Sequence, residues 1–93
     1  MVVGTLVLDF LVIESRSLKA RRRVVKSLKD RIRGRFNVSV ADLSDQDVWQ
    51  RAVLGVAVVA NDGRFANEVL SRVLNLVLSD PRIDLVHQEL HVG

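Results

Sequence analysis

Several residue types that carry chemistry in other proteins are absent or scarce in this chain of 93 residues. It has no cysteine, no tyrosine, one proline, five glycines, three phenylalanines and one tryptophan. Without cysteine there is no disulfide framework, thiolate nucleophile or cysteine-ligated metal site. The glycines form no phosphate-binding loop, and no Ser-His-Asp group or carboxylate pair is evident. We therefore expect a protein that is not an enzyme and needs no cofactor.

Long apolar runs are also missing. No segment reaches the roughly 18 apolar residues that a membrane-spanning helix needs. The first residues, MVVGTLVLDFLVI, lack a basic start and a small-residue cleavage motif, and Asp9 interrupts them. With 48% hydrophobic residues and no low-complexity tract, the composition predicts a single globular domain over residues 1–93, located in the cytoplasm.

Charge is distributed very unevenly. Residues 16–35 contain ten of the fourteen Lys and Arg but only one acid, Asp30, and so carry +9, whereas the rest of the chain carries −6. A field of this kind indicates an anionic partner.

This basic segment has the period of a helix over residues 17–34, with Ser15 or Ser17 as N-cap and Gly34 near the C-terminal cap. An apolar arc faces the core, and basic residues follow one flank of it. The arc comprises Leu18, Val24, Val25, Leu28, Ile32 and Phe36. The basic flank, the candidate phosphate-binding surface, comprises Lys19, Arg22, Arg23, Lys26, Lys29 and Arg33. Arg21 and Arg35 fall inside the apolar arc, where we expect their guanidinium groups to reach water past the helix ends.

Two segments, residues 2–13 and 51–60, are rich in β-branched residues and have the length of strands. In the first, Leu6, Leu8, Phe10 and Val12 share the better core face; in the second, Leu54, Val56 and Val58 do. The opposite face is still apolar, which indicates two central strands with an interface for a partner. The residues expected to line that interface are Val7, Leu11, Val53, Ala57, Val59 and, from a later strand, Leu85.

The remaining elements complete an alternating pattern. Residues 37–41 predict a short strand, and residues 42–50 an acidic loop. We expect Trp49 to anchor this loop onto the domain or a partner subunit rather than to contact a ligand. That loop has one helical turn at most, capped by Ser44 with Asp47. Its acids have a spacing similar to that of a calcium loop, but the required glycine and distal glutamate are missing. A helix follows from the N-cap Asp62 to about residue 79, and a strand over 82–92. On that last strand His87, Glu89 and His91 alternate, as is usual at a sheet edge, and we expect no metal there.

The order strand, helix, strand, strand, helix, strand defines the fold class. With right-handed crossovers it predicts an α+β, ferredoxin-like βαββαβ sandwich, with a four-stranded antiparallel sheet in the order 4-1-3-2 and two helices on one face.

The stretch from Ser17 to Ala52 also resembles a known family, the YlxP-like proteins, small bacterial proteins of unknown function. The residues that carry the resemblance are Ser17-Leu18-Lys19, Arg22, Val25-Lys26, Leu28, Arg31, Phe36-Asn37-Val38-Ser39, Asp47, Trp49-Gln50-Arg51 and Ala52. Where that family often has Glu after the second strand, this chain has Asp42. The resemblance implies a cytosolic ferredoxin-like domain, linked by gene neighbourhood to translation and ribosome assembly, with no established activity.

Two hypotheses of function follow. The first is a nucleic-acid-binding module, associated with RNA or the ribosome, in which the basic helix contacts phosphates. Bases stacked on the sheet are not expected, since residues 51–60 contain no aromatic side chain and Phe10 is assigned to the core. The second is a structural or regulatory homodimer formed through the open sheet face. An alternative to the first is that the basic flank is simply a solvated helix surface.

Overall fold

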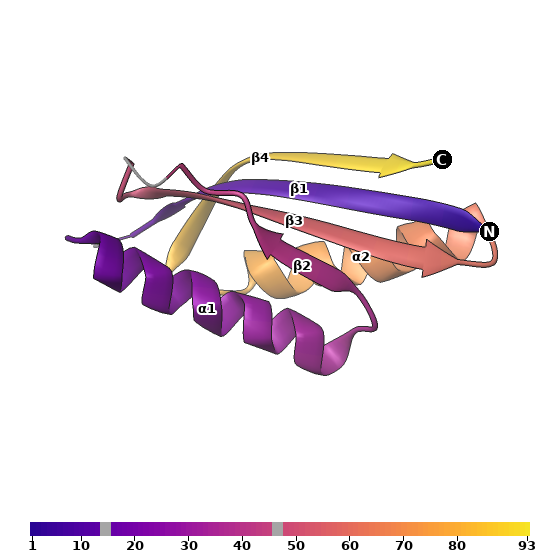
Figure 1. Cartoon of the computed structure of the whole chain (residues 1–93), viewed down its shortest axis with the longest axis horizontal. Coiled ribbons are helices and arrows are strands. Elements are labelled where there is room, and N and C mark those ends of the chain that lie inside the picture. The colour runs from indigo at the N-terminus through magenta and orange to yellow at the C-terminus, as the bar shows by residue number, and fades with distance from the viewer. Residues whose placement is uncertain (14–15, 46–47) are drawn as a thin grey trace.

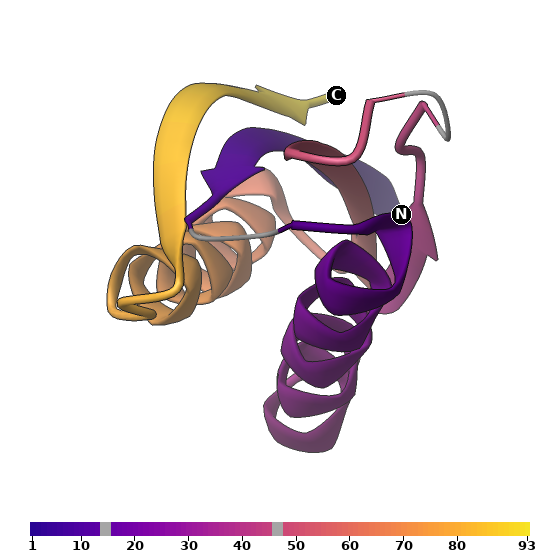
Figure 2. The same ribbon diagram turned by 90° about the vertical axis from the view of Figure 1, so that its left-hand side faces the viewer.

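A computed structural model describes residues 1–13, 16–45 and 48–93. The elements follow in the order β1 (Val2–Val12), α1 (Leu18–Arg35), β2 (Ser39–Asp42), β3 (Arg51–Ala60), α2 (Gly63–Leu78) and β4 (Ile83–Val92). The strands form one antiparallel sheet in the order β2-β3-β1-β4, and both helices lie on the same face of it (Figures 1 and 2). The predicted element order, strand order and central position of β1 and β3 are therefore confirmed.

The core lies between the sheet and the helices. β1 contributes Leu6, Leu8 and Phe10, and β3 contributes Leu54, Val56 and Val58, all buried as the alternation predicts. The two helices fill the other side with Val25, Leu28, Ile32, Ala66, Leu70, Val73 and Val77. α2 packs closely, because a Cβ on Gly4 would come within 2.9 Å of Leu70 Cδ1. One face of the sheet is thus fully covered.

The helix ends largely follow the predicted caps. The Ser17 hydroxyl accepts a hydrogen bond from the N–H of Ala20 at 3.1 Å, whereas Ser15, the other candidate, lies outside the described residues. Asp62 likewise accepts from the N–H of Phe65 at 2.8 Å. The predicted end of α1 near residue 34 is confirmed to within one residue, since the helix ends at Arg35. The predicted cap was wrong, because the C-cap is Phe36, whose N–H donates to Ile32 O, and not Gly34.

β4 departs from simple alternation. Leu85 pairs with Phe10 while His87 pairs with Asp9, so Val86 is an extra residue that forms a bulge. The bulge shifts every residue before it by one position relative to the two faces. Leu85 therefore packs against the core and not on the open face, and its assignment to the interface was wrong.

Asp80, in the turn before β4, ties the two helices to the sheet. Its carboxylate accepts hydrogen bonds from Arg82 Nη2 at 2.7 Å and Arg31 Nη1 at 3.2 Å, and Arg82 also donates to the Ser27 hydroxyl at 3.1 Å. Arg31 and Ser27 belong to α1. The hydrogen bonds from Arg82 outweigh the effect of burial and hold the pKa of Asp80 below its ordinary value of 3.8.

We predict that Asp80→Ala lowers the free energy of unfolding by about 2 kcal/mol, less than for a fully buried pair because Arg31 and Arg82 keep 45% and 40% of their side chains exposed. A group with a lowered pKa stabilises the fold above its ordinary pKa and loses that contribution as the pH falls. The difference from wild type in urea unfolding should therefore be complete at pH 7 and shrink below pH 3.8. Glu68→Ala, which removes an exposed partner of Arg72, is the control and should change stability little. A constant difference down to pH 2 would contradict this role for Asp80.

Candidate nucleic-acid interface

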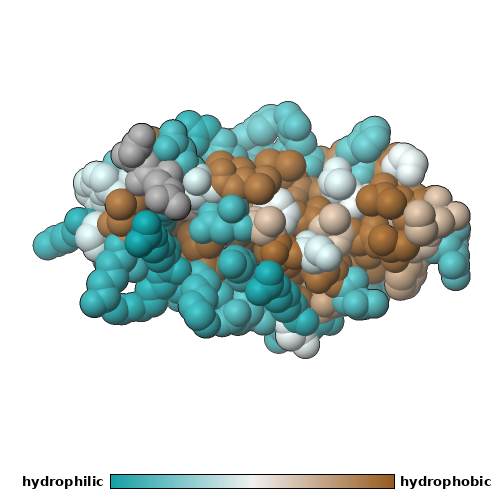
Figure 3. Space-filling view, in the orientation of Figure 1, coloured by the Kyte–Doolittle hydropathy of each residue, from teal (hydrophilic) through white to brown (hydrophobic). Residues whose placement is uncertain are grey.

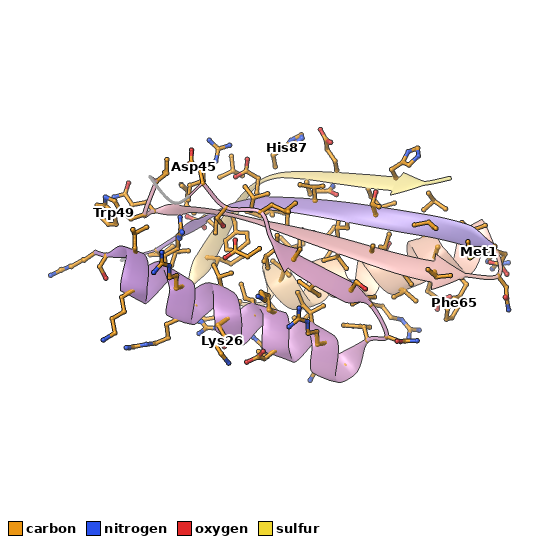
Figure 4. The ribbon with its side chains drawn as sticks, viewed as in Figure 1. Met1, Lys26, Asp45, Trp49, Phe65 and His87 are labelled. Carbon is orange, nitrogen blue, oxygen red and sulfur yellow. The ribbon has the colours of Figure 1, made fainter. Side chains whose placement is uncertain are left out.

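Six basic side chains follow one flank of α1: Lys19, Arg22, Arg23, Lys26, Lys29 and Arg33, called here the basic ladder. Five of them are exposed and Lys29 is half-buried. All of them except Arg23 recur every three or four residues, and Arg23 lies slightly farther round the helix, so the six share one side of it. Lys26 lies on the side of α1 turned away from the sheet (Figure 4). The structure thus presents the predicted ladder as one continuous surface.

The two flanks of α1 differ in how their charges are neutralised. Towards α2, Arg31 pairs with Asp80. On the ladder side, Arg33 Nη2 donates to the carbonyl of Val40 in β2 at 2.8 Å, which places the ladder beside the edge strand of the sheet. A carbonyl oxygen is neutral, so Arg33 keeps its full charge.

Asp30 supplies the single carboxylate paired with the ladder in the described part of the chain. Its Oδ2 lies 2.8 Å from Lys26 Nζ, with both side chains largely exposed. The hydrogen bond from Lys26 lowers the pKa of Asp30. Within residues 1–13, 16–45 and 48–93, no side-chain hydrogen bond or ion pair involves Lys19, Arg22, Arg23 or Lys29, although the charge of Lys29 also helps to lower the pKa of Asp30. Four cations are therefore available to an external anion.

Arg21 does not reach water, and the prediction that it would was wrong. Only 2% of the residue is exposed, and its Nη1 donates to the carbonyls of Asp45 at 2.8 Å, Val48 at 2.6 Å and Arg51 at 3.3 Å. Asp45 and Val48 belong to the connection between β2 and β3, and Arg51 is the first residue of β3. One buried guanidinium therefore fixes this connection against the first turns of α1. Arg35, by contrast, is exposed as expected.

The one sequence feature that indicates a buried role for Arg21 is its position inside the apolar arc. An arginine between apolar residues in the middle of a packed helix either extends past an end or meets buried acceptors. The sequence does not say which carbonyls lack partners, so only the structure distinguishes the two cases.

The open face of the sheet carries the apolar surface. Val7, Val53 and Ala57 are half-buried there, and Leu11 and Val59 are exposed. Leu43 lies over Gly55, where an added Cβ would come within 2.8 Å of Leu43 Cδ1. Beside it, the residues around Thr5, Val7, Ala41 and Ala57 line a shallow apolar hollow of about 310 Å³. Figure 3 shows apolar side chains in a band along the molecule, with hydrophilic side chains on either side.

Polar residues of the sheet lie on β1, β3 and β4. Arg51 makes a two-pronged ion pair with Asp9, and the hydrogen bonds from Arg51 lower the pKa of that carboxyl. His87 Nε2 lies 3.2 Å from Glu89 Oε1, and both are exposed, as is His91. In the part of the chain that the structure describes, no three His, Asp or Glu side chains are grouped to hold a metal. Asp47, part of the calcium-like spacing and the expected partner of Ser44 in capping a turn, lies outside that part.

Sequence comparison places the chain among known proteins. A family model described as "Protein of unknown function (DUF503)" matches residues 3–90. The chain belongs to the DUF503 family. A relative of this DUF503 chain, the uncharacterized protein YlxP of Bacillus subtilis, is 33% identical over 82 residues, which cover 88% of this chain and 89% of YlxP. The predicted family resemblance is confirmed, and it brings no assigned activity.

Solved structures support the fold. A de novo designed protein with a ferredoxin fold matches with a TM-score of 0.54 at 15% identity, covering 98% of this chain and 85% of the design. A variant of SnoaB, a cofactor-independent oxygenase from Streptomyces nogalater, matches with a TM-score of 0.54 at 12% identity, covering 98% and 90%. At these identities the likeness shows the ferredoxin-like architecture alone. No helix within the described residues is long and apolar enough to cross a membrane.

We predict that Arg21→Met, which keeps the apolar stem and removes the donors, lowers the free energy of unfolding by about 2–3 kcal/mol because three partly buried carbonyls lose their donor. Amides of residues 43–45 and 48–50 should also exchange faster with deuterium. Arg22→Met, one position along and exposed, is the matched control and should leave stability within about 0.5 kcal/mol. Equal effects of the two substitutions would show that Arg21 does not hold the connection.

Proposed function

We propose that this protein is a non-enzymatic, cytoplasmic RNA-binding module, associated with structured RNA such as that of the ribosome, and that the basic ladder contacts its phosphates. The observation that carries the proposal is the set of four exposed or half-exposed cations on one helix flank without a carboxylate partner among the described residues. Holding like charges together on one helix is destabilising unless a partner neutralises them.

The dimensions of the ladder suit a nucleic-acid backbone. From Lys19 to Arg33 the helix axis rises about 21 Å at about 1.5 Å per residue. A duplex carries one phosphate per roughly 3.4 Å of axis on each strand, so several phosphates fall within that length. Arg side chains add bidentate hydrogen bonds to phosphate oxygens.

The sheet is not arranged for sequence readout. Phe10 of β1 is fully buried and β3 contains no aromatic residue, so the two central strands offer no ring on which bases stack. Binding led by a helix and directed at phosphates favours RNA recognised by its backbone shape, and needs neither metal nor cofactor.

A second candidate function rests on the open sheet face. We infer that two copies associate through the surface formed by Val7, Val53, Ala57 and their neighbours, because the hollow there is apolar and a two-fold contact would bury it twice. The helices, on the opposite face, would then point outwards in both copies.

For the RNA-binding proposal, we expect the affinity for RNA to fall with salt concentration, and we expect the slope to depend on the residues of the basic ladder. Six phosphate contacts give a slope of log affinity against log salt of roughly −4 to −5. The variant Lys19→Gln/Arg22→Gln should reduce the steepness by about 1.5, measured with a labelled RNA hairpin by fluorescence anisotropy at several salt concentrations. The control Arg64→Gln/Arg72→Gln removes the same charge from exposed positions of α2 and should keep the wild-type slope. Equal slopes for both variants would reject the ladder as the binding surface.

For the dimer, sedimentation velocity at tens of micromolar should show two copies of the wild-type chain. Ala57→Glu places a charge in the apolar hollow and should give a monomer that melts like the wild type. Val86→Glu changes an exposed apolar residue at the β4 bulge, away from the hollow, and should remain dimeric. A monomeric wild type at these concentrations would remove this candidate.

A further inference from the structure

The end of the sheet next to the start of α1 brings three segments side by side. The N–H of Val12 donates to the carbonyl of Gln50 at 2.8 Å, and the N–H of Ile13 donates to the carbonyl of Arg82 at 2.8 Å. Residues 11–13 therefore run between residues 49–51 on one side and 82–84 on the other. Asp84 pairs with Leu11 in the sheet register. It therefore lies on the opposite side of residues 11–13 from residues 49–51.

This arrangement encloses a hollow of about 490 Å³, whose lining includes Leu11, Ile13, Arg16, Trp49, Gln50 and Asp84. Leu11 and Ile13 are each 43% exposed and Trp49 is 39% exposed, so apolar side chains and an aromatic ring are accessible together. Beside them stand a guanidinium, a carboxamide and a carboxylate. The hollow is distinct from the apolar one on the middle of the open face and is far more polar.

The backbone on both sides of Trp49 is attached to α1. The buried Arg21 guanidinium donates to the carbonyls of Val48 and Arg51, on either side of the tryptophan in the chain. Arg21 lies in the first turns of α1, between ladder residues Lys19 and Arg22. The backbone that carries the tryptophan is therefore positioned by the fold, which reduces the entropy that a ligand has to offset.

The chemistry of the lining matches that of an unpaired nucleotide. An indole ring is a platform on which a base of any sequence stacks. Arg16 offers donors to a phosphate, and Asp84 and Gln50 offer an acceptor and an amide to the hydrogen-bonding edge of a base. A carboxylate favours bases that carry amino groups, namely adenine, cytosine and guanine, over uracil.

We propose that this hollow binds one unstacked, amino-bearing base of an RNA loop or bulge while the basic ladder follows the adjoining backbone. The proposal rests on the RNA-binding function proposed above and adds to it the structural class of the RNA, one with an exposed unpaired nucleotide. A blunt duplex, whose bases are all stacked, contacts the basic ladder but leaves the hollow empty.

The single tryptophan provides the readout, since the chain has no tyrosine. A hairpin with an adenine-rich loop should quench Trp49 fluorescence at saturation, whereas a blunt RNA duplex with the same number of phosphates should not. By anisotropy, Trp49→Ala should weaken hairpin binding about tenfold and leave duplex binding unchanged. Phe65→Ala is the matched control, since Phe65 is 54% exposed and lies at the opposite end of the molecule (Figure 4). It should change neither affinity.

A mononucleotide separates this proposal from the function on which it rests. Adenosine monophosphate at millimolar concentration should quench Trp49 in the wild type and equally in Lys19→Gln/Arg22→Gln, and uridine monophosphate should quench less. Quenching that persists while RNA affinity shows no dependence on the ladder would reject the RNA-binding proposal for α1 and keep the base site. RNA binding that depends on the ladder, with unchanged fluorescence and full hairpin affinity in Trp49→Ala, would overturn the base site alone and point to Trp49 as a protein contact. Absence of both signals would overturn both.

Discussion

The contact between Arg21 and three backbone carbonyls is the constraint on which the arrangement at the start of α1 depends. α1 packs on the sheet along one apolar arc, and near its other end Arg33 donates a hydrogen bond to Val40 of β2. The described residues of the connection from β2 to β3 have no regular strand partner. A guanidinium that donates to the carbonyls of Asp45, Val48 and Arg51 joins the two. Because the donors are buried, water competes poorly for these carbonyls, and the loop takes one position relative to the helix. An apolar residue at position 21 would leave the carbonyls without donors.

The other charged residues of α1 lie on two flanks that differ in their carboxylate partners. On one flank Arg31 has an internal partner, since it shares the carboxylate of Asp80 with Arg82 from outside the helix. The other flank has Asp30 alone among the described residues and projects away from the sheet. A helix that needed charge only for solubility would mix signs on its outer surface, where pairs four residues apart stabilise it. The acids of this protein are instead spread over other elements, which leaves the ladder electrostatically unsatisfied.

Sequence periodicity predicted the parts of this structure that repeat. Alternation in residues 2–13 and 51–60 identified the buried face of both central strands, and the 3.6-residue period of residues 17–34 identified both the apolar arc and the ladder. It did not predict irregular features. The bulge at Val86 reverses the assignment of Leu85, because an extra residue is visible only when two strands are aligned. Gly34 was a reasonable end for α1, yet the helix gains one further residue because Phe36 has a carbonyl acceptor in Ile32. The role of Arg21 was not predicted for another reason, since it depends on backbone carbonyls that lie 24 to 30 residues away in the sequence.

Leu11 is shared by two surfaces, the predicted dimer interface on the open face of the sheet and the hollow beside Trp49. Along β1, the apolar hollow is centred near Thr5 and Val7, whereas the Trp49 hollow lies at Leu11 and Ile13. Val7 and Ile13 are six positions apart along the chain, about 20 Å at roughly 3.3 Å per residue. A two-fold interface confined to the middle of the sheet would therefore leave the Trp49 hollow open, while one that extended to Leu11 would close it. If the proposals above hold, each dimer of the first kind would present two basic ladders on its outer side, each with its own Trp49 hollow, to a single folded RNA.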